Sequence, residues 1–400
     1  MKQYLDNNNV AMNQSKNINH PETQARITDN IAALKAFKNG DETLLDKYTG
    51  WGGLRGAIFT RDIFCQLKFD CGLSDAEIAS IKQTTSSGYF TPVEIVRQMW
   101  ALCERHLPDV PHQILDPACG TNRFFANMPK SWKEQSALIG VELETLSAAM
   151  AQARVHQSNV HCLGFEDFHA GAEFDIIVGN PPYGKQTIDD KHQPDLMQYC
   201  IHHAFALKAF RLLVEGGYLC LLLPSWFLDN TSQHVREVIA NEGGELVEAV
   251  RLPDNLFQNA TVTVDCVLIK KCAPGTNDRR WVDVGRVTLD GRRERINRYF
   301  LDNPKRVLGK LASVRMYDRH GLTCRYTRDP IDLWQQLGGR GVAQAMTTAL
   351  GIAPVGTSRL DALIAQISQE ITTRQEKYRQ LMALKIQQQT LTASLNALQG

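Results

Sequence analysis

The feature that most constrains the fold is a repeated alternation of short apolar segments with helical stretches over residues 86–272. Apolar runs bounded by Gly, Pro or polar residues are typical of buried strands, and the helical stretches between them provide crossovers between parallel strands. The best strand candidates are ILDPACG, ALIGVELE, FDIIVGN, GGYLCLLLP and VTVDCVLIKK. The pattern therefore predicts an α/β fold built on a doubly wound sheet.

Two segments precede this domain. Residues 1–20 form an Asn-rich polar tail, and residues 21–85 have a helical pattern with capping-box spacing at Ser74 and Glu77. The loop YTGWGGLRGAIF interrupts the helical pattern, and its closely spaced glycines permit backbone conformations that other residues resist. We expect a shaped loop there, with Trp51 as an ordinary core residue.

Two further segments follow the domain: a basic segment over residues 273–357 and a long helix over residues 358–400. Residues 276–328 contain fourteen Lys plus Arg against six Asp plus Glu, with Trp, Phe and Tyr interleaved. That composition is suited to phosphate contact and base stacking, although a solvated basic face is the alternative. The mostly 3–4 spacing of apolar residues in the helix fits either a coiled-coil arm or a helix packed on its own protein.

The overall composition limits the class of protein. A hydrophobic fraction of 43% allows a large core, while no apolar run reaches the roughly 20 residues that span a bilayer. The N-terminus has no apolar signal-peptide core, so we expect a soluble, cytoplasmic protein. The ten cysteines show no C-x-x-C spacing, which indicates neither a disulfide framework nor a zinc site.

Candidate ligand-binding residues stand at successive strand ends. Asp116 ends the first strand and leads through a turn with Gly120 into a helix, a geometry that presents backbone amides to a ligand. Glu142 ends the second strand, where an acid can accept hydrogen bonds from ribose hydroxyls. Just before FDIIVGN, Asp167 and Phe168 offer an acceptor for an adenine amine and a ring for the base. A single strand-end acid is more typical of a solvated position, but together these residues outline an adenosine pocket.

This order of motifs, followed by NPPY at residues 180–183, resembles the S-adenosylmethionine-dependent DNA adenine-N6 methyltransferases over roughly residues 86–272. The upstream segment GYFTPVEIV matches the family's T-P segment, in which we expect Thr91 to cap a helix that has Pro92 at its first position. The cofactor motifs precede NPPY, as in the γ-type members. TGWGGL and NRYFLDNPKRVLG resemble pieces of adenine methyltransferases from phages and conjugative elements.

The resemblance implies a Rossmann-like methyltransferase sheet, S-adenosylmethionine as the cofactor, and a cytoplasmic location in a bacterium or a phage-infected cell. It places the cofactor contacts at Tyr89, Phe90, Thr91, Asp116, Ala118, Gly120, Glu142, Asp167 and Phe168, and the catalytic residues at Asn180, Pro181, Pro182 and Tyr183. The Asn180 side-chain carbonyl and the Pro181 backbone carbonyl would accept from the adenine amine, favouring its tetrahedral geometry. Tyr183 would stack on a flipped-out adenine, with Phe257 as the candidate for a second ring or, alternatively, a core aromatic. No metal is expected.

Several alternatives stay open at this point. NPPY also occurs in methyltransferases of glutamine side chains or RNA guanine N2, but the T-P segment and the basic segment favour adenine in DNA. The chain departs from the family pattern at Asn122, where a second glycine is usual. Asn tolerates a left-handed backbone, but its side chain could crowd the cofactor.

The chain is accordingly expected to be a site-specific DNA adenine methyltransferase of the restriction-modification kind. The alternative is a catalytically weak, DNA-binding modification subunit. DNA is the expected partner, without a membrane. A specificity or helicase subunit, or a second copy joined through the C-terminal helix, is a further candidate.

Overall fold

The computed structural model describes residues 20–337, except residues 59, 87, 108, 171–172, 233, 258–260 and 317–318. The expected polar tail ahead of His20 and the expected long helix over residues 358–400 lie outside the described residues. The domain limits inferred from the sequence stay predictions.

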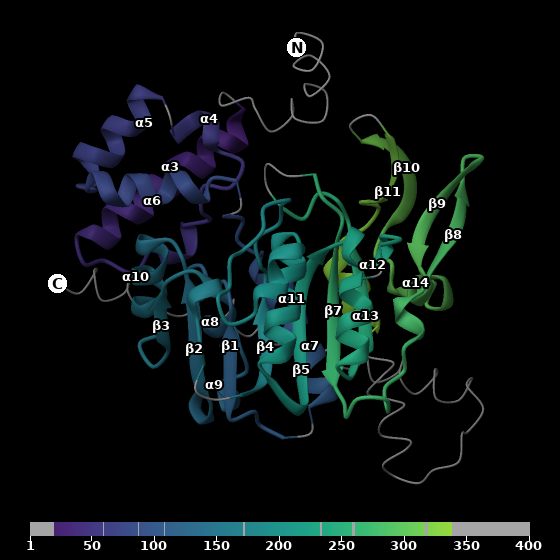
Figure 1. Ribbon diagram of the computed structural model, residues 1–400. Helices are drawn as coiled ribbons and strands as arrows, with labels where there is room; N and C mark the ends of the chain where they lie inside the picture. Colours follow the sequence, from purple (N-terminus) through teal and green to yellow (C-terminus); the bar gives the residue numbers. More distant parts are fainter. Residues whose placement is uncertain are drawn as a thin grey trace, which may run out of the picture. The chain divides into compact units, whose positions relative to one another are not determined.

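The centre of the fold is a seven-stranded sheet with the strand order β3-β2-β1-β4-β5-β7-β6 (Figure 1). Its strands are β1 (Gln113–Asp116), β2 (Ala137–Glu142), β3 (Asn159–Cys162), β4 (Phe174–Gly179), β5 (Leu213–Pro224), β6 (Gly244–Leu252) and β7 (Val264–Lys271). The pairs from β3 to β5 are parallel, whereas β7 runs antiparallel to both β5 and β6. The first strand, β1, lies inside the sheet. β2 and β3 follow on one side of β1, and β4 lies on its other side. This doubly wound, Rossmann-like arrangement confirms the expected fold class.

Helices cover both faces of the sheet. Successive strand residues point to opposite faces, so Ile177 of β4 faces α11 (Ile201–Arg211) and α13 (His234–Asn241). Its neighbours Ile176 and Val178 belong to the cluster built on α7 (Val93–His106). Figure 1 shows α11 and α13 in front of the sheet and α7 behind it. Both faces of β4 are therefore buried, which explains its nearly continuous apolar sequence.

The segment before the sheet is helical. Its helices are α3 (Pro21–Lys38), α4 (Arg55–Ile58), α5 (Arg61–Cys65) and α6 (Asp75–Thr84). Both hydrogen bonds of the predicted capping box between Ser74 and Glu77 are present. Trp51 is buried in the core of these helices, which also includes Leu146 of α10 (Thr145–Arg154). The helices thus pack against the sheet domain through α10.

The basic segment folds as two antiparallel hairpins. One pairs β8 (Val284–Leu289) with β9 (Arg292–Asn297), and the other pairs β10 (Lys310–Met316) with β11 (Arg319–Arg325). Asp290 and Gly291 turn the first hairpin with positive φ, the geometry for which Asp-Gly turns are suited. Helix α14 (Arg298–Asp302) follows that hairpin. Two aromatics from the expected stacking set, Trp281 and Phe300, lie in the core instead, so a role in base stacking was a wrong expectation for them.

Two strands of the central sheet, β3 and β6, were missed from the sequence, as were the four strands of the hairpins. β3 is short, half-exposed and polar at the sheet edge, and β6 has charged residues among its apolar ones, so neither has a clear apolar run. As a result, FDIIVGN is the fourth strand along the chain, and Asp167 follows β3. Within the described residues, no helix combines the length and apolar character needed to span a membrane. All ten cysteines are free.

Candidate active site

Asn180 follows the last residue of β4, and its amide is oriented by two neighbours. Its Nδ2 donates to the Tyr89 carbonyl oxygen at 3.2 Å. The Tyr183 hydroxyl lies 2.7 Å from Asn180 Oδ1 and 3.1 Å from the Leu222 carbonyl oxygen, to which it also donates. Because Nδ2 is committed to a backbone acceptor, the Oδ1 atom is the side of the amide left to accept further hydrogen bonds.

A pocket lies beside this amide, with about 320 Å³ of empty volume that is continuous with solvent. It is lined by Ser86, Tyr89, Asn180, Pro181, Tyr183, Phe257 and Val262, and we call it the NPPY pocket. The ring centroids of Tyr89 and Phe257 are 6.2 Å apart and tilted by 55°. The pocket therefore combines aromatic walls with an amide acceptor, as sites for planar polar ligands do.

The next feature lies where β1 and β4 are neighbours, which is the point at which the strand order reverses. Asp116 ends β1 and is fully buried, and its Oδ1 accepts from the Ala118 backbone N–H at 3.2 Å. Its Oδ2 has no hydrogen-bond partner in the protein, and burial raises the pKa of this carboxyl well above its usual range. A Cβ at Gly179 would lie 2.5 Å from Asp116 Oδ1, so the close approach of the two strand ends requires glycine. Ligands of doubly wound sheets bind at such reversal points.

The turn after β1 contains Gly120 and Asn122, both with positive φ. A Cβ on Gly120 would lie 2.9 Å from the Phe90 ring, so a side chain there would displace the aromatic. Asn122 adopts φ 57° and ψ 33°, which confirms that Asn can stand in the left-handed turn. Its Nδ2 donates to the Ala151 carbonyl and to Ser158 Oγ, both at 2.8 Å. The amide thus points into the interior beside α10, where it holds the turn in place.

Glu142 at the end of β2 is tied to the same turn. Its Oε2 accepts from the Gly120 N–H at 2.9 Å, and its Oε1 accepts from the Glu144 N–H at 2.8 Å. Burial raises the pKa of Glu142 to about 7 against the effect of these hydrogen bonds. A half-buried carboxylate held by two amides is a preformed acceptor for hydroxyl groups.

Asp167 and Phe168 lie after β3 at the far end of the parallel strands. Asp167 is exposed and ends a short 3₁₀ turn, Phe165–Asp167. Phe168 is buried, stacked on Phe165 at 6.2 Å and edge-on to His161 at 5.3 Å. The predicted contacts of this pair with a cofactor stay predictions.

The T-P segment is placed between the two parts of the site. Tyr89 lines the NPPY pocket, while Phe90 lies against Gly120. The expected cap at Thr91 is wrong: α7 begins at Val93, Pro92 is the N-cap residue, and no side chain caps this end. Thr91 precedes this N-cap, and its carbonyl accepts from the Arg123 guanidinium at 3.1 Å. Thr91 Oγ1 is buried without a partner in the protein.

The glycine loop around Gly50 to Gly53 contacts the backbone just before Tyr89. Two side chains that hold this loop, Arg26 and Asn30, were not predicted from the sequence. The Gly52 N–H donates to the Gly88 carbonyl at 2.9 Å, and a Cβ on Gly52 would lie 2.6 Å from the same oxygen. Arg26 of α3 donates to the carbonyls of Gly50 and Gly52 at 2.9 and 2.8 Å. The buried Asn30 donates to the Gly50 carbonyl at 2.7 Å. The loop therefore fixes the backbone immediately before Tyr89, whose carbonyl orients Asn180.

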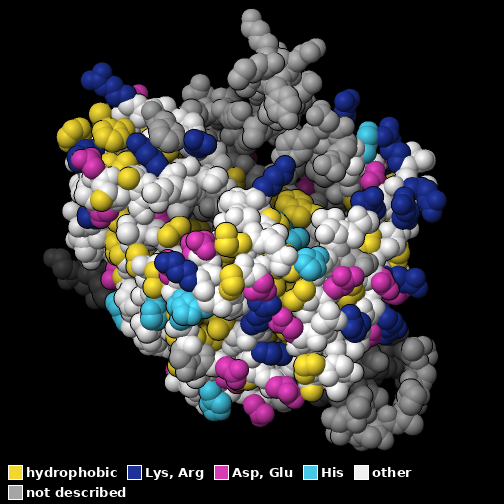
Figure 2. Space-filling model, in the orientation of Figure 1, with side chains coloured by type: hydrophobic (Ala, Val, Ile, Leu, Met, Phe, Trp, Pro, Cys, Tyr) yellow, Lys and Arg dark blue, Asp and Glu magenta, His cyan; other side chains and the backbone are white. Residues whose placement is uncertain are grey.

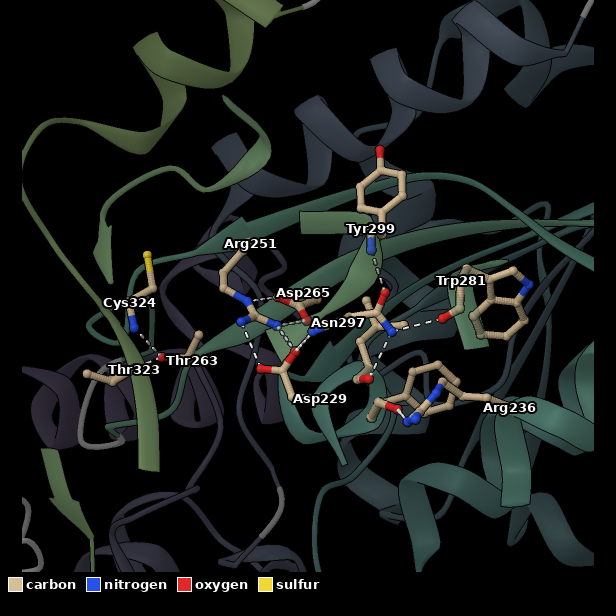
Figure 3. Close-up of polar contacts among 12 residues, drawn as sticks. Asp229, Arg236, Arg251, Thr263, Asp265, Trp281, Asn297, Tyr299, Thr323 and Cys324 are labelled. Carbon is tan, nitrogen blue, oxygen red and sulfur yellow. Dashed lines mark hydrogen bonds and ion pairs between the residues drawn. The ribbon is translucent and has the colours of Figure 1, made fainter. Parts of the chain in front are cut away.

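A buried ionic cluster joins the hairpins to the sheet edge, and Figure 3 shows its contacts. Arg251 of β6 is fully buried and donates to both oxygens of Asp265 at 2.8 Å (Figure 3). A second ion pair links Arg251 Nη1 to Asp229 Oδ2 at 2.8 Å. The Asn297 N–H from β9 donates to Asp229 Oδ1 at 2.8 Å. We call these four residues the Arg251 junction.

The second hairpin is attached by buried hydroxyl groups. Thr323 of β11 donates to Asp254 Oδ2 at 2.9 Å, and its hydroxyl lies 2.9 Å from that of Thr263. The Cys324 N–H donates to Thr263 Oγ1 at 3.0 Å. The exposed basic side chains of the hairpins are Arg286, Arg292, Arg293, Arg295, Lys310, Arg315 and Arg325. Figure 2 shows Lys and Arg side chains gathered at the right of the view, where the β8–β9 hairpin lies in Figure 1.

Together, the reversal point between β1 and β4, the acids after β1 and β2 and the NPPY pocket define the class of a Rossmann-like methyltransferase. The chain belongs to the N-6 DNA methylase family, whose model matches residues 76–286, just over half of the 400 residues. This match also covers the strands β1 to β7 that form the site.

Curated relatives agree with this membership. The chain is 30% identical over 203 residues to type II methyltransferase M.CvrRI of Paramecium bursaria Chlorella virus XZ-6E, covering 49% of this chain and 52% of the relative. It is 26% identical over 210 residues to modification methylase CviBIII of Paramecium bursaria Chlorella virus NC1A, covering 50% and 54%. A tRNA1(Val) (adenine(37)-N6)-methyltransferase of Serratia proteamaculans is 27% identical over 127 residues, covering 28% and 48%. The chain thus spans about half the length of the curated relatives it matches.

Proposed function

We propose that this protein transfers a methyl group from S-adenosylmethionine to the N6 amine of an adenine in DNA. The observation that carries the proposal is the oriented Asn180 amide in an aromatic-walled pocket at the end of β4. An adenine amine has two N–H bonds, and it becomes a better nucleophile when acceptors draw those bonds out of the ring plane. Asn180 Oδ1 and the Pro181 carbonyl are the two acceptors in this proposal.

The residues near the reversal point fit the cofactor. Asp116 Oδ2 and Thr91 Oγ1 are buried polar atoms without partners in the protein, which is a costly arrangement unless a ligand contacts them. Glu142, held by the Gly120 and Glu144 amides, is suited to accept from ribose hydroxyls. S-Adenosylmethionine supplies an electrophilic methyl group when it is bound. This chain's own residues orient the two reactants.

The aromatic residues of the pocket hold the base in this proposal. Tyr183 and Phe257 offer ring faces, and the Tyr183 hydroxyl can give up Asn180 Oδ1 to the amine while it keeps the Leu222 carbonyl as its acceptor. An adenine within a duplex cannot enter such a pocket, so it is flipped out of the stack. After the N–CH₃ bond forms and the S–CH₃ bond breaks, the methylated amine carries the positive charge and loses its extra proton to solvent, so no strong general base is needed.

DNA is the substrate favoured by the charge of the hairpins. The β8–β9 hairpin is anchored to the sheet domain through the Arg251 junction and the β10–β11 hairpin through Thr323, so their exposed arginines and Lys310 are held in position to contact phosphates. The similarity to a tRNA adenine methyltransferase makes RNA the second candidate. RNA guanine N2, a protein glutamine, or a DNA-binding role without catalysis are the remaining outcomes. A specificity subunit is the partner class that we propose.

The test uses the purified full chain with S-adenosylmethionine labelled in its methyl group. Unmethylated plasmid DNA, a mixed tRNA preparation and a protein extract are supplied separately, and the products are digested and separated by mass spectrometry. We expect N6-methyladenine from DNA and at most a small fraction of that amount from tRNA. Label in tRNA or in protein alone would assign a different substrate, and binding to DNA without label would leave only the modification-subunit reading.

A further inference from the structure

Trp226 is a large aromatic residue at the site edge that the proposed reaction does not use. It begins the short helix α12 (Trp226–Asp229), two residues after β5 ends, and its side chain is 43% exposed. A single exposed apolar residue is common on protein surfaces and carries no meaning by itself. The contacts that hold Trp226 and its helix are what distinguish this residue.

The first contact is with a buried histidine beside the NPPY motif. The Trp226 indole N–H donates to His202 Nε2 at 2.8 Å, and the two rings are perpendicular at 5.8 Å. Burial lowers the pKa of His202 to about 4, so at neutral pH the imidazole is uncharged and keeps an acceptor nitrogen. His202 also lies 3.4 Å from Cys200 Sγ through Nε2 and 6.3 Å from the Tyr183 ring. The indole is thus connected to the NPPY pocket through one neutral side chain.

His202 also belongs to a cluster of three residues of the kinds that bind metal ions. Potential ligand atoms of Cys200, His202 and His203 lie within 4.8 Å of one another. Nε2 of His202 already accepts from the Trp226 indole at 2.8 Å, so in this arrangement its lone pair is engaged by the indole. His202 therefore serves Trp226 rather than a metal ion.

The second set of contacts holds the backbone of α12, as Figure 3 shows in part. Arg236 donates to the Phe227 carbonyl at 2.6 Å, and Asn297 Nδ2 donates to the Leu228 carbonyl at 2.9 Å. Asp229 pairs with Arg251 in the Arg251 junction. These three donors are fully buried, and burying charged groups is costly unless their geometry is fixed. A helix of four residues has little stability of its own, so the surrounding donors fix the direction in which Trp226 projects.

The third observation concerns charge on the other side of α12. Arg295 of β9 donates to Thr231 Oγ1 at 3.1 Å, two residues beyond the helix. Arg286, Arg292 and Arg293 are exposed on the same hairpin. The hairpin that carries these guanidinium groups therefore contacts the segment that directly follows α12. An aromatic face next to cations is the arrangement that single-stranded and distorted nucleic acids contact by stacking and phosphate binding.

We propose that Trp226 is a stacking platform for a DNA base next to the one held in the NPPY pocket, an inference that rests on the proposed function. Flipping a base removes a stacking partner from its neighbour, and a fixed indole replaces part of that lost stacking. Trp226 then stabilises the opened strand while the exposed arginines of β9 hold its phosphates.

The test compares Trp226→Ala and Trp226→Phe with Phe69→Ala, which removes another exposed aromatic from the N-terminal helices. The measurement is fluorescence anisotropy of a labelled 40-base single strand of mixed sequence, read at several salt concentrations with the full chain. We expect Trp226→Ala to weaken binding by about five- to 150-fold, the range for one stacked base, and Trp226→Phe to lose much less. Phe69→Ala should bind as the original chain does.

The salt dependence separates stacking from charge. Trp226→Ala should leave the slope of log affinity against log salt unchanged, whereas Arg295→Ala should reduce it by up to about one. Unchanged cofactor affinity and thermal unfolding would show that the Trp226→Ala chain is folded. Full DNA affinity of the Trp226→Ala chain would overturn the proposal that Trp226 stacks on a base. If that chain also changed its oligomeric state, Trp226 would instead be a contact between protein subunits. Weakened binding together with no methyl transfer by the original chain would retain the platform and reject only the proposed function.

Discussion

The strand-reversal region around Asp116 and Thr91 and the Arg251 junction lie at the same edge of the sheet, but they differ in how their buried polar groups are paired. At the junction, the Arg251 guanidinium is matched by two carboxylates, and Asn297 adds a further hydrogen bond. Near the pocket, Asp116 Oδ2 and Thr91 Oγ1 have no partner in the protein. At the junction the buried charges are paired with one another, although Arg251 Nη1 makes no well-aligned hydrogen bond. Asp116 instead carries a buried carboxyl oxygen without a hydrogen-bond partner in the protein, and it lies where we propose that the ligand binds. The comparison therefore separates the part that supports the structure from the part that we propose binds the reactants.

The largest expected effect is the loss of folding stability when the Arg251 junction is broken. Arg251→Ala leaves Asp229 and Asp265 buried without their cation, and we expect the free energy of unfolding to fall by about 3–5 kcal/mol. Burial already raises the pKa of Asp265 to about 6 despite the guanidinium, and removing Arg251 raises it further. A carboxyl with a raised pKa destabilises the fold increasingly as it ionises. The loss in free energy of unfolding caused by Arg251→Ala should therefore be larger at pH 8, where Asp265 is ionised, than at pH 5.

Chemical denaturation at both pH values provides the measurement. Arg298→Ala is the matched control, because its ion pair with Asp302 is exposed and should contribute less than about 1 kcal/mol. Equal losses from the two arginines would mean that the junction is not the support we describe.

A smaller effect is expected from the loop behind Tyr89. Gly52→Ala would place a Cβ 2.6 Å from the Gly88 carbonyl and 2.9 Å from Tyr89 Cδ2. The displaced Tyr89 carbonyl would release the Asn180 amide, so we expect kcat to fall by roughly ten- to a hundredfold, as for misplaced catalytic groups.

Steady-state kinetics of DNA methylation with varied cofactor would separate kcat from KM. Gly40→Ala is the control, because a Cβ there meets nothing within 4 Å, although the positive φ of Gly40 adds backbone strain that Gly52 does not have. A loss confined to KM for the cofactor, or an equal loss in both variants, would argue against orientation of Asn180 by the loop.

The smallest expected effect is the pH dependence of cofactor affinity. Because the pKa of Glu142 is raised to about 7, its ionised form is disfavoured in the empty protein, and its contribution to stability falls as pH rises from about 4.5 to 7. Binding of ribose hydroxyls favours the carboxylate. We therefore expect cofactor affinity to rise with pH up to about 7, by at most tenfold per unit, and to level off above it.

Titration calorimetry of S-adenosylmethionine from pH 5.5 to 8.5 measures this dependence directly. Glu142→Gln should bind more weakly and without the pH dependence. The same pH dependence in the Gln variant would place the titrating group elsewhere, with Asp116 as the next candidate, since burial raises its pKa as well.

Much of the fold and of the site could be predicted because the relevant residues follow apolar strands directly. Asp116, Glu142 and Asn180 each stand at or just after a strand end, and the carboxyl ends of parallel strands meet at one edge. β3 could not be predicted, since an exposed edge strand needs no apolar run. Arg26 could not be assigned, because its partners lie 23 to 26 residues away in a loop whose path depends on tertiary structure. His202 and Trp226 likewise meet only through the packing of α11 and α12.

The most direct test of the central claim is Asn180→Ala, measured for methyl transfer to DNA and, separately, for binding of cofactor and DNA. We expect transfer of labelled methyl to adenine to fall by at least about 100- to 1,000-fold, as when one positioned hydrogen-bonding group is removed from an active site. Cofactor and DNA affinity should change much less, since neither the Asp116 and Glu142 region nor the hairpins are altered. Undiminished transfer by a chain that carries Ala at position 180 would contradict the account.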